Sequence, residues 1–87
     1  MTYKQAKYMI LERLRISGWQ VKKELKTPWA KPPFVFNDPN VKLYFKAQSV
    51  WIGQGRPYHS LHVDPKKLAL MGIEQLDNYL RNEMETY

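Results

Sequence analysis

The segment from Val41 to Gln48 alternates between apolar and polar side chains at every residue. Successive side chains of a β-strand point to opposite faces, so this alternation predicts a strand with one covered face and one face open to solvent. The covered face would carry Val41, Leu43, Phe45 and Ala47, and the open face would carry Lys42, Tyr44, Lys46 and Gln48. The chain therefore needs a second layer that packs against one side of a sheet.

A helical pattern precedes this strand, over residues 3–17. Apolar side chains recur there every three or four residues, and Thr2 with Gln5 has the spacing of a capping box. Gly18 predicts the end of this helix, because glycine readily adopts the left-handed conformation that closes a helix. The chain therefore begins with an amphipathic helix that offers an apolar face to the sheet.

A second helical region follows the strands and begins at Asp64 and Pro65. Aspartate suits the N-cap position, and proline is favoured at the first helical position. The apolar pattern continues toward the C-terminus, but Gly72 interrupts it. Two alternatives follow: one continuous helix, or a short turn over residues 65–70 and then a helix over residues 73–84.

The residues between the helical regions predict strands joined by loops. Residues 27–33 contain three prolines and predict a stiff loop, because proline lacks the N–H group that a sheet needs. Residues 37–40, with the sequence Asn-Asp-Pro-Asn, predict the turn of a hairpin that ends in the Val41–Gln48 strand. Further strands are expected over residues 19–26, 34–36 and 58–63, and residues 50–52 are expected to continue the Val41–Gln48 strand.

The order of these segments predicts one small α+β domain that covers residues 1–87. It comprises a helix, three or four antiparallel strands and a helix, with the helices on one sheet face in a two-layer sandwich. A length of 87 residues leaves no room for a second domain. The opposite face of the sheet is therefore expected to be open to solvent.

Composition and spacing exclude several classes of protein. The chain has no cysteine, which removes disulfide scaffolds, cysteine-ligated metals and thiol nucleophiles. No apolar run is long enough to cross a membrane and the N-terminus has no signal-peptide pattern, so we expect a cytoplasmic protein without membrane contact. His59 and His62 lie three residues apart on a predicted strand, on opposite faces, which argues against a shared metal. We therefore expect no metal, no cofactor and no enzymatic activity.

Positive charge dominates most of the chain, whose formal net charge is +6. Residues 1–73 carry thirteen Lys and Arg against four Asp and Glu, a net charge of +9, whereas residues 74–87 have a net charge of −3. Such polarity attracts a polyanion to one part of a small domain, although a net charge of this size also serves solubility alone. The placement of the basic side chains on the fold distinguishes the two interpretations.

Basic and aromatic residues occur together on the predicted open face. Lys42, Tyr44 and Lys46 form a row in which two cations flank an aromatic ring. Lysines neutralise phosphates and an exposed ring stacks on an unpaired base, so this row predicts a module that binds DNA or RNA. The alternative is a solvated face on which Tyr44 is an ordinary cross-strand partner. The predicted nucleic-acid contacts are Lys22, Lys26, Lys42, Tyr44, Lys46, Arg56, Lys66 and Lys67.

The tryptophans support a second hypothesis. Trp29 lies in the proline-rich segment, where it either covers one end of the core or presents a binding surface. Trp19 and Trp51 lie in predicted strands and are expected in the core. As a binding surface, Trp29 would anchor an acidic protein partner, and the chain would be a small inhibitor or adaptor of the kind that a mobile element encodes. The sequence leaves the oligomeric state open.

Overall fold

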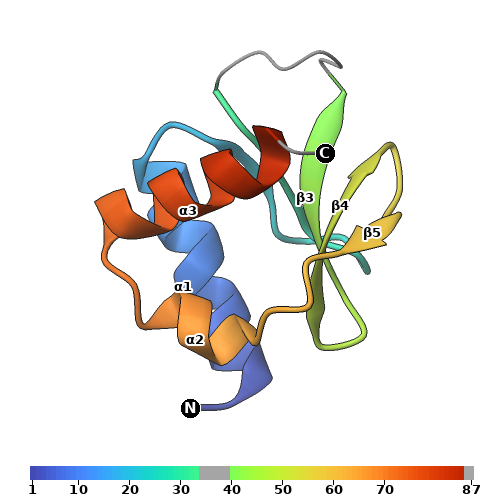
Figure 1. Ribbon diagram of the computed structural model, residues 1–87. Coiled ribbons are helices and arrows are strands. Elements are labelled where there is room, and N and C mark those ends of the chain that lie inside the picture. Colours follow the sequence, from blue (N-terminus) through green and yellow to red (C-terminus); the bar gives the residue numbers. More distant parts are fainter. Residues whose placement is uncertain (34–39, 86–87) are drawn as a thin grey trace.

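The computed structural model describes residues 1–33 and 40–85 and confirms a small α+β domain (Figure 1). The helices form one layer and an antiparallel sheet forms the other. Within the described residues the sheet has five strands, where three or four were expected. In chain order the elements are α1 (Tyr3–Ile16), β1 (Gln20–Lys22), β2 (Trp29–Lys31), β3 (Val41–Lys46), β4 (Ser49–Gln54), β5 (His59–Ser60), α2 (Pro65–Ala69) and α3 (Ile73–Glu85).

The sheet is a meander in which each strand pairs antiparallel with the next strand of the chain. The three helices lie on the same side of the sheet, as Figure 1 shows. Val41, Leu43 and Phe45 of β3 are buried between the layers, in one cluster with Ile10 of α1 and Leu76 of α3. The predicted covered face of this strand is therefore confirmed except at Ala47, which is exposed in the turn after β3, and the other face of the strand points away from the helices.

Helix α1 begins at the predicted residue and ends at Ile16, one residue earlier than predicted. The Gln5 N–H donates to the Thr2 hydroxyl at 3.1 Å, and the Thr2 N–H donates to the Gln5 side chain at 2.9 Å, which is the predicted capping box. Gly18 has a φ of +94°, and the Trp19 N–H donates to the Leu14 carbonyl oxygen at 2.9 Å. This Schellman motif turns the chain toward the sheet at a position where glycine avoids steric strain.

The C-terminal helical region is divided, so the second of the two predicted alternatives is confirmed. Asp64 caps α2 by accepting a hydrogen bond from the Lys66 N–H at 2.9 Å, and Pro65 is the first helical residue. Gly72 lies between α2 and α3, which run in different directions (Figure 1). Among the described residues, no helix has both the length and the apolar character that a bilayer-spanning segment requires.

The strand expected over residues 41–48 ends two residues early. Ala47 and Gln48 have φ values of +51° and +57° and form a two-residue turn between β3 and β4. Two left-handed central residues are typical of a type I′ hairpin turn. Residues 50–52 were expected to continue β3. They belong instead to β4, which runs antiparallel beside β3.

The proline-rich segment contains a strand, contrary to the prediction of a loop over residues 27–33. Trp29 and Ala30 of β2 pair with Tyr44 and Leu43 of β3. The three prolines of this segment flank the three residues of β2 and so leave the pairing intact. Trp29 therefore belongs to the sheet.

The remaining predicted strands are shorter than expected or fall outside the described residues. Two residues of the strand expected over 58–63 form β5, because the chain turns at His62, which has a φ of +53°. Three residues of the strand expected over 19–26 form β1. The strand expected over residues 34–36, and most of the turn at residues 37–40, lie outside the described residues.

An ion-pair cluster joins α1 to the segment that follows β1. The Glu12 carboxylate accepts hydrogen bonds from Arg15 Nε at 3.1 Å and from Lys23 Nζ at 3.0 Å. These two hydrogen-bonded cations lower the pKa of Glu12 to about 2. A carboxylate with a lowered pKa favours the folded state at neutral pH.

We expect this cluster to contribute to the loss of stability in acid. The contribution of Glu12 is complete above its ordinary pKa of 4.5 and disappears as the pH falls toward about 2. A Glu12→Gln variant should therefore show a smaller fall in Tm on acidification than the parent protein. The effect should be small and should shrink with salt, because the partners are exposed. Thermal melts of Glu12→Gln and of the control Glu24→Gln at several pH values test this, and equal behaviour of the two variants would contradict it.

Candidate functional site

The sheet face that points away from the helices, here called the outer sheet face, carries a row of aromatic side chains. Strand pairing places Trp29 of β2 opposite Tyr44 of β3, and Tyr44 opposite Trp51 of β4. Lys22 of β1 lies opposite Trp29, and Ser60 of β5 lies opposite Trp51. Directly paired residues project from the same face, so these five side chains form one row across the sheet.

The lysines of the strands project from the same face of the sheet as this row. The five strands contain four lysines and no acidic residue. Steps of two along a strand preserve the face, which places each of these lysines on the outer sheet face. They are Lys22, Lys31, Lys42 and Lys46. The acidic residues of α3, in the other layer, are Glu74, Asp77, Glu83 and Glu85. The helix layer carries charges of both signs, because α1 and α2 contribute basic residues beside these acidic ones, whereas the charged residues of the strands are all lysines.

Trp29 is half-buried and has a cation over its ring. The Lys42 ammonium lies 4.8 Å from the centre of the Trp29 ring, within the range of a cation–π interaction. Trp29 does not belong to the core cluster or to the side chains packed against it, which disfavours the first of its two alternatives, that of covering one end of the core. Its indole is instead part of the outer sheet face, in contact with a lysine of the neighbouring strand.

Trp51 is also half-buried on the outer sheet face, although the sequence placed it in the core. Its indole N–H donates to the Lys46 carbonyl oxygen at 3.0 Å, which fixes the orientation of the ring. Trp19 does lie in the core, as expected: it is 3% exposed, and its indole N–H donates to the Asp77 carboxylate at 2.8 Å. Two of the three tryptophans are therefore available at the surface.

Tyr44 lies on the predicted face but lacks the exposure that base stacking requires. Its side chain is 4% exposed, although it is not part of the core cluster. In the strand register it lies between Trp29 and Trp51. The expectation of an accessible Tyr44 ring is therefore wrong, and the two indoles beside it are the accessible aromatic surfaces of this row.

The loop between β4 and β5 lies against the outer sheet face at Gly53. Gly53 follows Trp51 by two residues on β4, so both positions are on the outer sheet face, and Gly53 pairs with Lys42 of β3. A Cβ atom at Gly53 would lie 1.8 Å from the Arg56 carbonyl oxygen, so the loop main chain occupies the space of a side chain. The structure therefore brings the loop that carries the exposed residue Arg56 to the side of the row on which Lys42 lies.

Lys26 lies on the opposite side of the row, at the Lys46 end of β3. It is exposed in the loop between β1 and β2. This loop is held beside the end of β3, because the Phe45 N–H donates to the Pro28 carbonyl oxygen at 2.9 Å. Lys26 and Lys46 are therefore at one end of the sheet, and Lys42 and Arg56 are toward the other.

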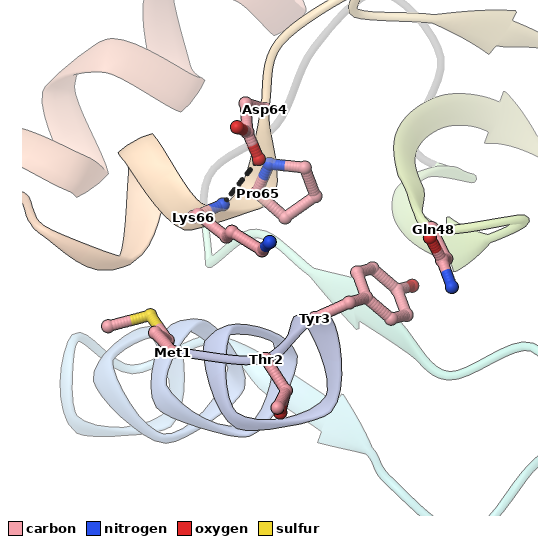
Figure 2. Close-up of a pocket in the computed structure, with 7 residues that line it drawn as sticks. All are labelled: Met1, Thr2, Tyr3, Gln48, Asp64, Pro65 and Lys66. Carbon is pink, nitrogen blue, oxygen red and sulfur yellow. Dashed lines mark hydrogen bonds between the residues drawn. The ribbon is translucent and has the colours of Figure 1, made fainter.

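Lys66 and Lys67 lie apart from the outer sheet face, on α2 in the helix layer. Lys66 lines a hollow of about 440 Å³ between α2, the start of α1 and the β3–β4 turn. Figure 2 shows the Lys66 amine on the Tyr3 side of this hollow and the Tyr3 ring pointing toward Gln48. Burial raises the pKa of Tyr3. The predicted contacts therefore form two separate groups, and the larger one is on the sheet.

His59 and His62 are closer together than the sequence predicts. Their ring centres are 6.5 Å apart in an edge-to-face arrangement, because the chain turns at His62. The prediction of opposite faces is therefore wrong. Residues 1–33 and 40–85 contain no group of three or more His, Cys, Asp or Glu side chains placed to hold a metal ion.

Two residues of the outer sheet face were missing from the predicted site. Lys31 was assigned to a loop, although the pattern of Trp29, Ala30 and Lys31 has the alternation of a strand. Trp51 was assigned to the wrong face, because a strand that continued through residue 48 would turn its ring toward the core. In both cases the segment was assigned to the wrong element of secondary structure. Pairing with β3 places both side chains on the outer sheet face.

Comparison of the chain with known protein families, with curated proteins and with solved structures finds no match. The outer sheet face therefore has to be interpreted from its own chemistry.

Proposed function

We propose that this protein is a non-enzymatic nucleic-acid-binding module that contacts phosphates with the lysines of the outer sheet face. The observation that carries the proposal is the segregation of charge: each lysine of the sheet has the same orientation, and the strands contain no acidic residue. Lysines that serve solubility alone need no common face. A polyanion gains most from cations that it can contact together, because each neutralised phosphate releases counterions.

The position of the lysines around the aromatic row supports the same proposal. Lys22 continues the row on β1, while Lys42 and Lys46 lie on either side of Tyr44 along β3. Arg56 adds a further cation beside Lys42, through the loop that Gly53 accommodates. A nucleic-acid strand on this face would meet the indole surfaces of the row together with Lys22 at its β1 end and Lys42 and Lys46 on its two sides.

We expect a Lys42→Gln/Lys46→Gln variant to lose about tenfold in affinity for oligonucleotides at low salt. The slope of log K against log salt should fall by about 1.4, since each phosphate contact on a single strand contributes about 0.7. Fluorescence anisotropy with labelled DNA and RNA 12-mers over a series of salt concentrations measures both quantities.

The matched control is Lys66→Gln/Lys67→Gln, which removes the same charge from α2 in the helix layer. Its affinity and salt slope should change much less. Equal losses in the two variants would mean that net charge alone drives binding and would contradict a site on the sheet. The absence of oligonucleotide binding by the parent protein at low salt would reject the proposal altogether.

One observation favours a second candidate, an adaptor that docks on an acidic protein. Tyr58 is 70% exposed in the loop that carries Arg56, which is the combination of an aromatic and a basic side chain found in binding hot spots. An acidic protein would use the same cations for association. This candidate remains if the parent protein fails to bind oligonucleotides.

A further inference from the structure

We infer that the outer sheet face selects single-stranded over duplex nucleic acid, with the indoles of Trp29 and Trp51 as stacking surfaces for unpaired bases. The inference rests on the proposed function and names its substrate class. Stacking of a base on an aromatic ring tolerates any sequence, because every base has a π-face. In a duplex those faces are already stacked on neighbouring bases, so an indole on a protein surface cannot reach them.

The dimensions of the sheet disfavour a duplex. Five strands about 4.8 Å apart make a face about 19 Å wide. The major groove of B-DNA is about 12 Å wide and admits a helix or a two-stranded ribbon, not a broad sheet. A single strand has no groove to match and can lie across the face.

The spacing of the two indoles suits consecutive stacking contacts. Trp29 and Trp51 flank Tyr44 on the neighbouring strands, so their backbones are about 10 Å apart. Tyr44, which is 4% exposed, forms the floor between them rather than a third stacking surface. Two unpaired bases would therefore lie on the two indoles, with the intervening sugar and phosphate above Tyr44.

The two indoles differ in the contacts that they make before a ligand binds. The Trp51 N–H donates to the Lys46 carbonyl oxygen at 3.0 Å, so ordering this ring on binding costs little entropy. Trp29 carries the Lys42 ammonium over its ring at 4.8 Å. A base that takes the place of this ammonium would free Lys42 to contact the adjoining phosphate, which couples stacking to phosphate binding.

The test compares one 12-mer as a single strand, in DNA and in RNA form, with the same DNA sequence as a duplex. The parent protein should bind the single strands more tightly than the duplex. Trp29→Ala and Trp51→Ala should each weaken single-strand binding about tenfold, which is within the range measured for loss of one base-stacking contact. Duplex binding, which uses phosphate contacts alone, should be unchanged. Trp29→Phe should restore part of the loss, because phenylalanine keeps a stacking face.

Tyr8→Ala is the matched control. Tyr8 is 42% exposed on α1 in the helix layer, and it also has a lysine over its ring, with Lys7 Nζ 5.2 Å from the ring centre. Removing this ring should leave binding to both forms unchanged. A loss as large as that of the tryptophan variants would contradict stacking on the outer sheet face.

A second measurement avoids variants altogether. Addition of oligo(dT) to the parent protein should quench the fluorescence of the surface indoles, while the buried Trp19 keeps its emission. Equal affinity for single strand and duplex, no quenching, and unchanged binding by the tryptophan variants would overturn the inference. The lysine variants would still lose affinity in that case, so the phosphate-binding proposal would stand. If the parent protein binds neither the single strand nor the duplex, the phosphate-binding proposal and the inference of base stacking are both rejected.

Discussion

Replacement of Gly53 by alanine is expected to lower the free energy of unfolding by about 3 kcal/mol, at the upper end of the usual cost of overpacking. The new Cβ atom would lie 1.8 Å from the Arg56 carbonyl oxygen and 3.0 Å from the Tyr58 backbone nitrogen. These are main-chain atoms, so no side-chain rotation relieves the clash. The loop itself must move, and the Tyr58 N–H, which donates to the Ile52 carbonyl oxygen at 3.2 Å, must move with it.

Urea denaturation measures this loss, and Gly72→Ala provides the comparison. No atom lies within 4 Å of a Cβ at Gly72, and Gly72 precedes α3 outside the left-handed region. Its replacement should therefore cost less than about 1 kcal/mol, the usual difference between glycine and alanine near a helix N-terminus. Similar losses of unfolding free energy in the two variants would mean that the main chain of the β4–β5 loop does not pack closely against Gly53. The Gly53→Ala variant should also bind oligonucleotides less tightly, because the loop that carries Arg56 is displaced from its position beside Lys42.

Replacement of Trp19 by alanine is expected to cost about 3–5 kcal/mol, the usual penalty for truncating a buried tryptophan. Trp19 is 3% exposed, immediately before β1, and its indole N–H reaches Asp77 of α3 at 2.8 Å. The residue therefore joins the start of the sheet to the last helix through both packing and a hydrogen bond. A loss of this size is a large part of the total stability of a small domain.

The other two tryptophans provide the control, because they lie outside the core cluster. Trp29→Ala and Trp51→Ala should each cost clearly less stability than Trp19→Ala in urea denaturation. If Trp19→Ala does not fold, Trp19→Phe keeps the ring volume and should show a smaller loss, including the loss of the bond to Asp77. Equal costs at the three positions would contradict the division of the tryptophans between core and surface.

The local signals of the helices were sufficient to locate them from the sequence. Thr2, Gly18, Asp64 and Pro65 act on the backbone within a few residues of themselves, so their effect does not depend on the rest of the fold. The buried face of β3 was also predictable, because its apolar side chains alternate strictly. These features together establish the helix–strand–helix order and the two layers.

The outer sheet face was only partly predictable, because it depends on pairing between strands. Ala47 and Gln48 are not typical type I′ turn residues, so no local pattern indicates that β3 ends at Lys46. A two-residue turn pairs Lys46 with Ser49, and this exchanges the faces of odd and even positions. Trp51 therefore reaches the outer sheet face, although a continued strand would have placed it in the core.

The burial of Tyr44 depends on the same pairing. The sequence shows a tyrosine between two lysines, which is typical of an exposed position. Large side chains on both neighbouring strands, Trp29 and Trp51, change the surroundings of that ring. Such cross-strand neighbours come from β2 and β4, neither of which the sequence pattern assigned correctly.

The brevity of the outermost strands restricts how a partner can approach the sheet. In the described residues, the two edge strands are short: β1 has three residues and β5 has two. Such short margins are poor templates for the strand of another chain, which limits both amyloid-like stacking and the capture of an extended peptide by backbone hydrogen bonds. The proposed recognition would therefore use side chains on the broad surface of the sheet, and substitutions there would alter it without rebuilding the backbone.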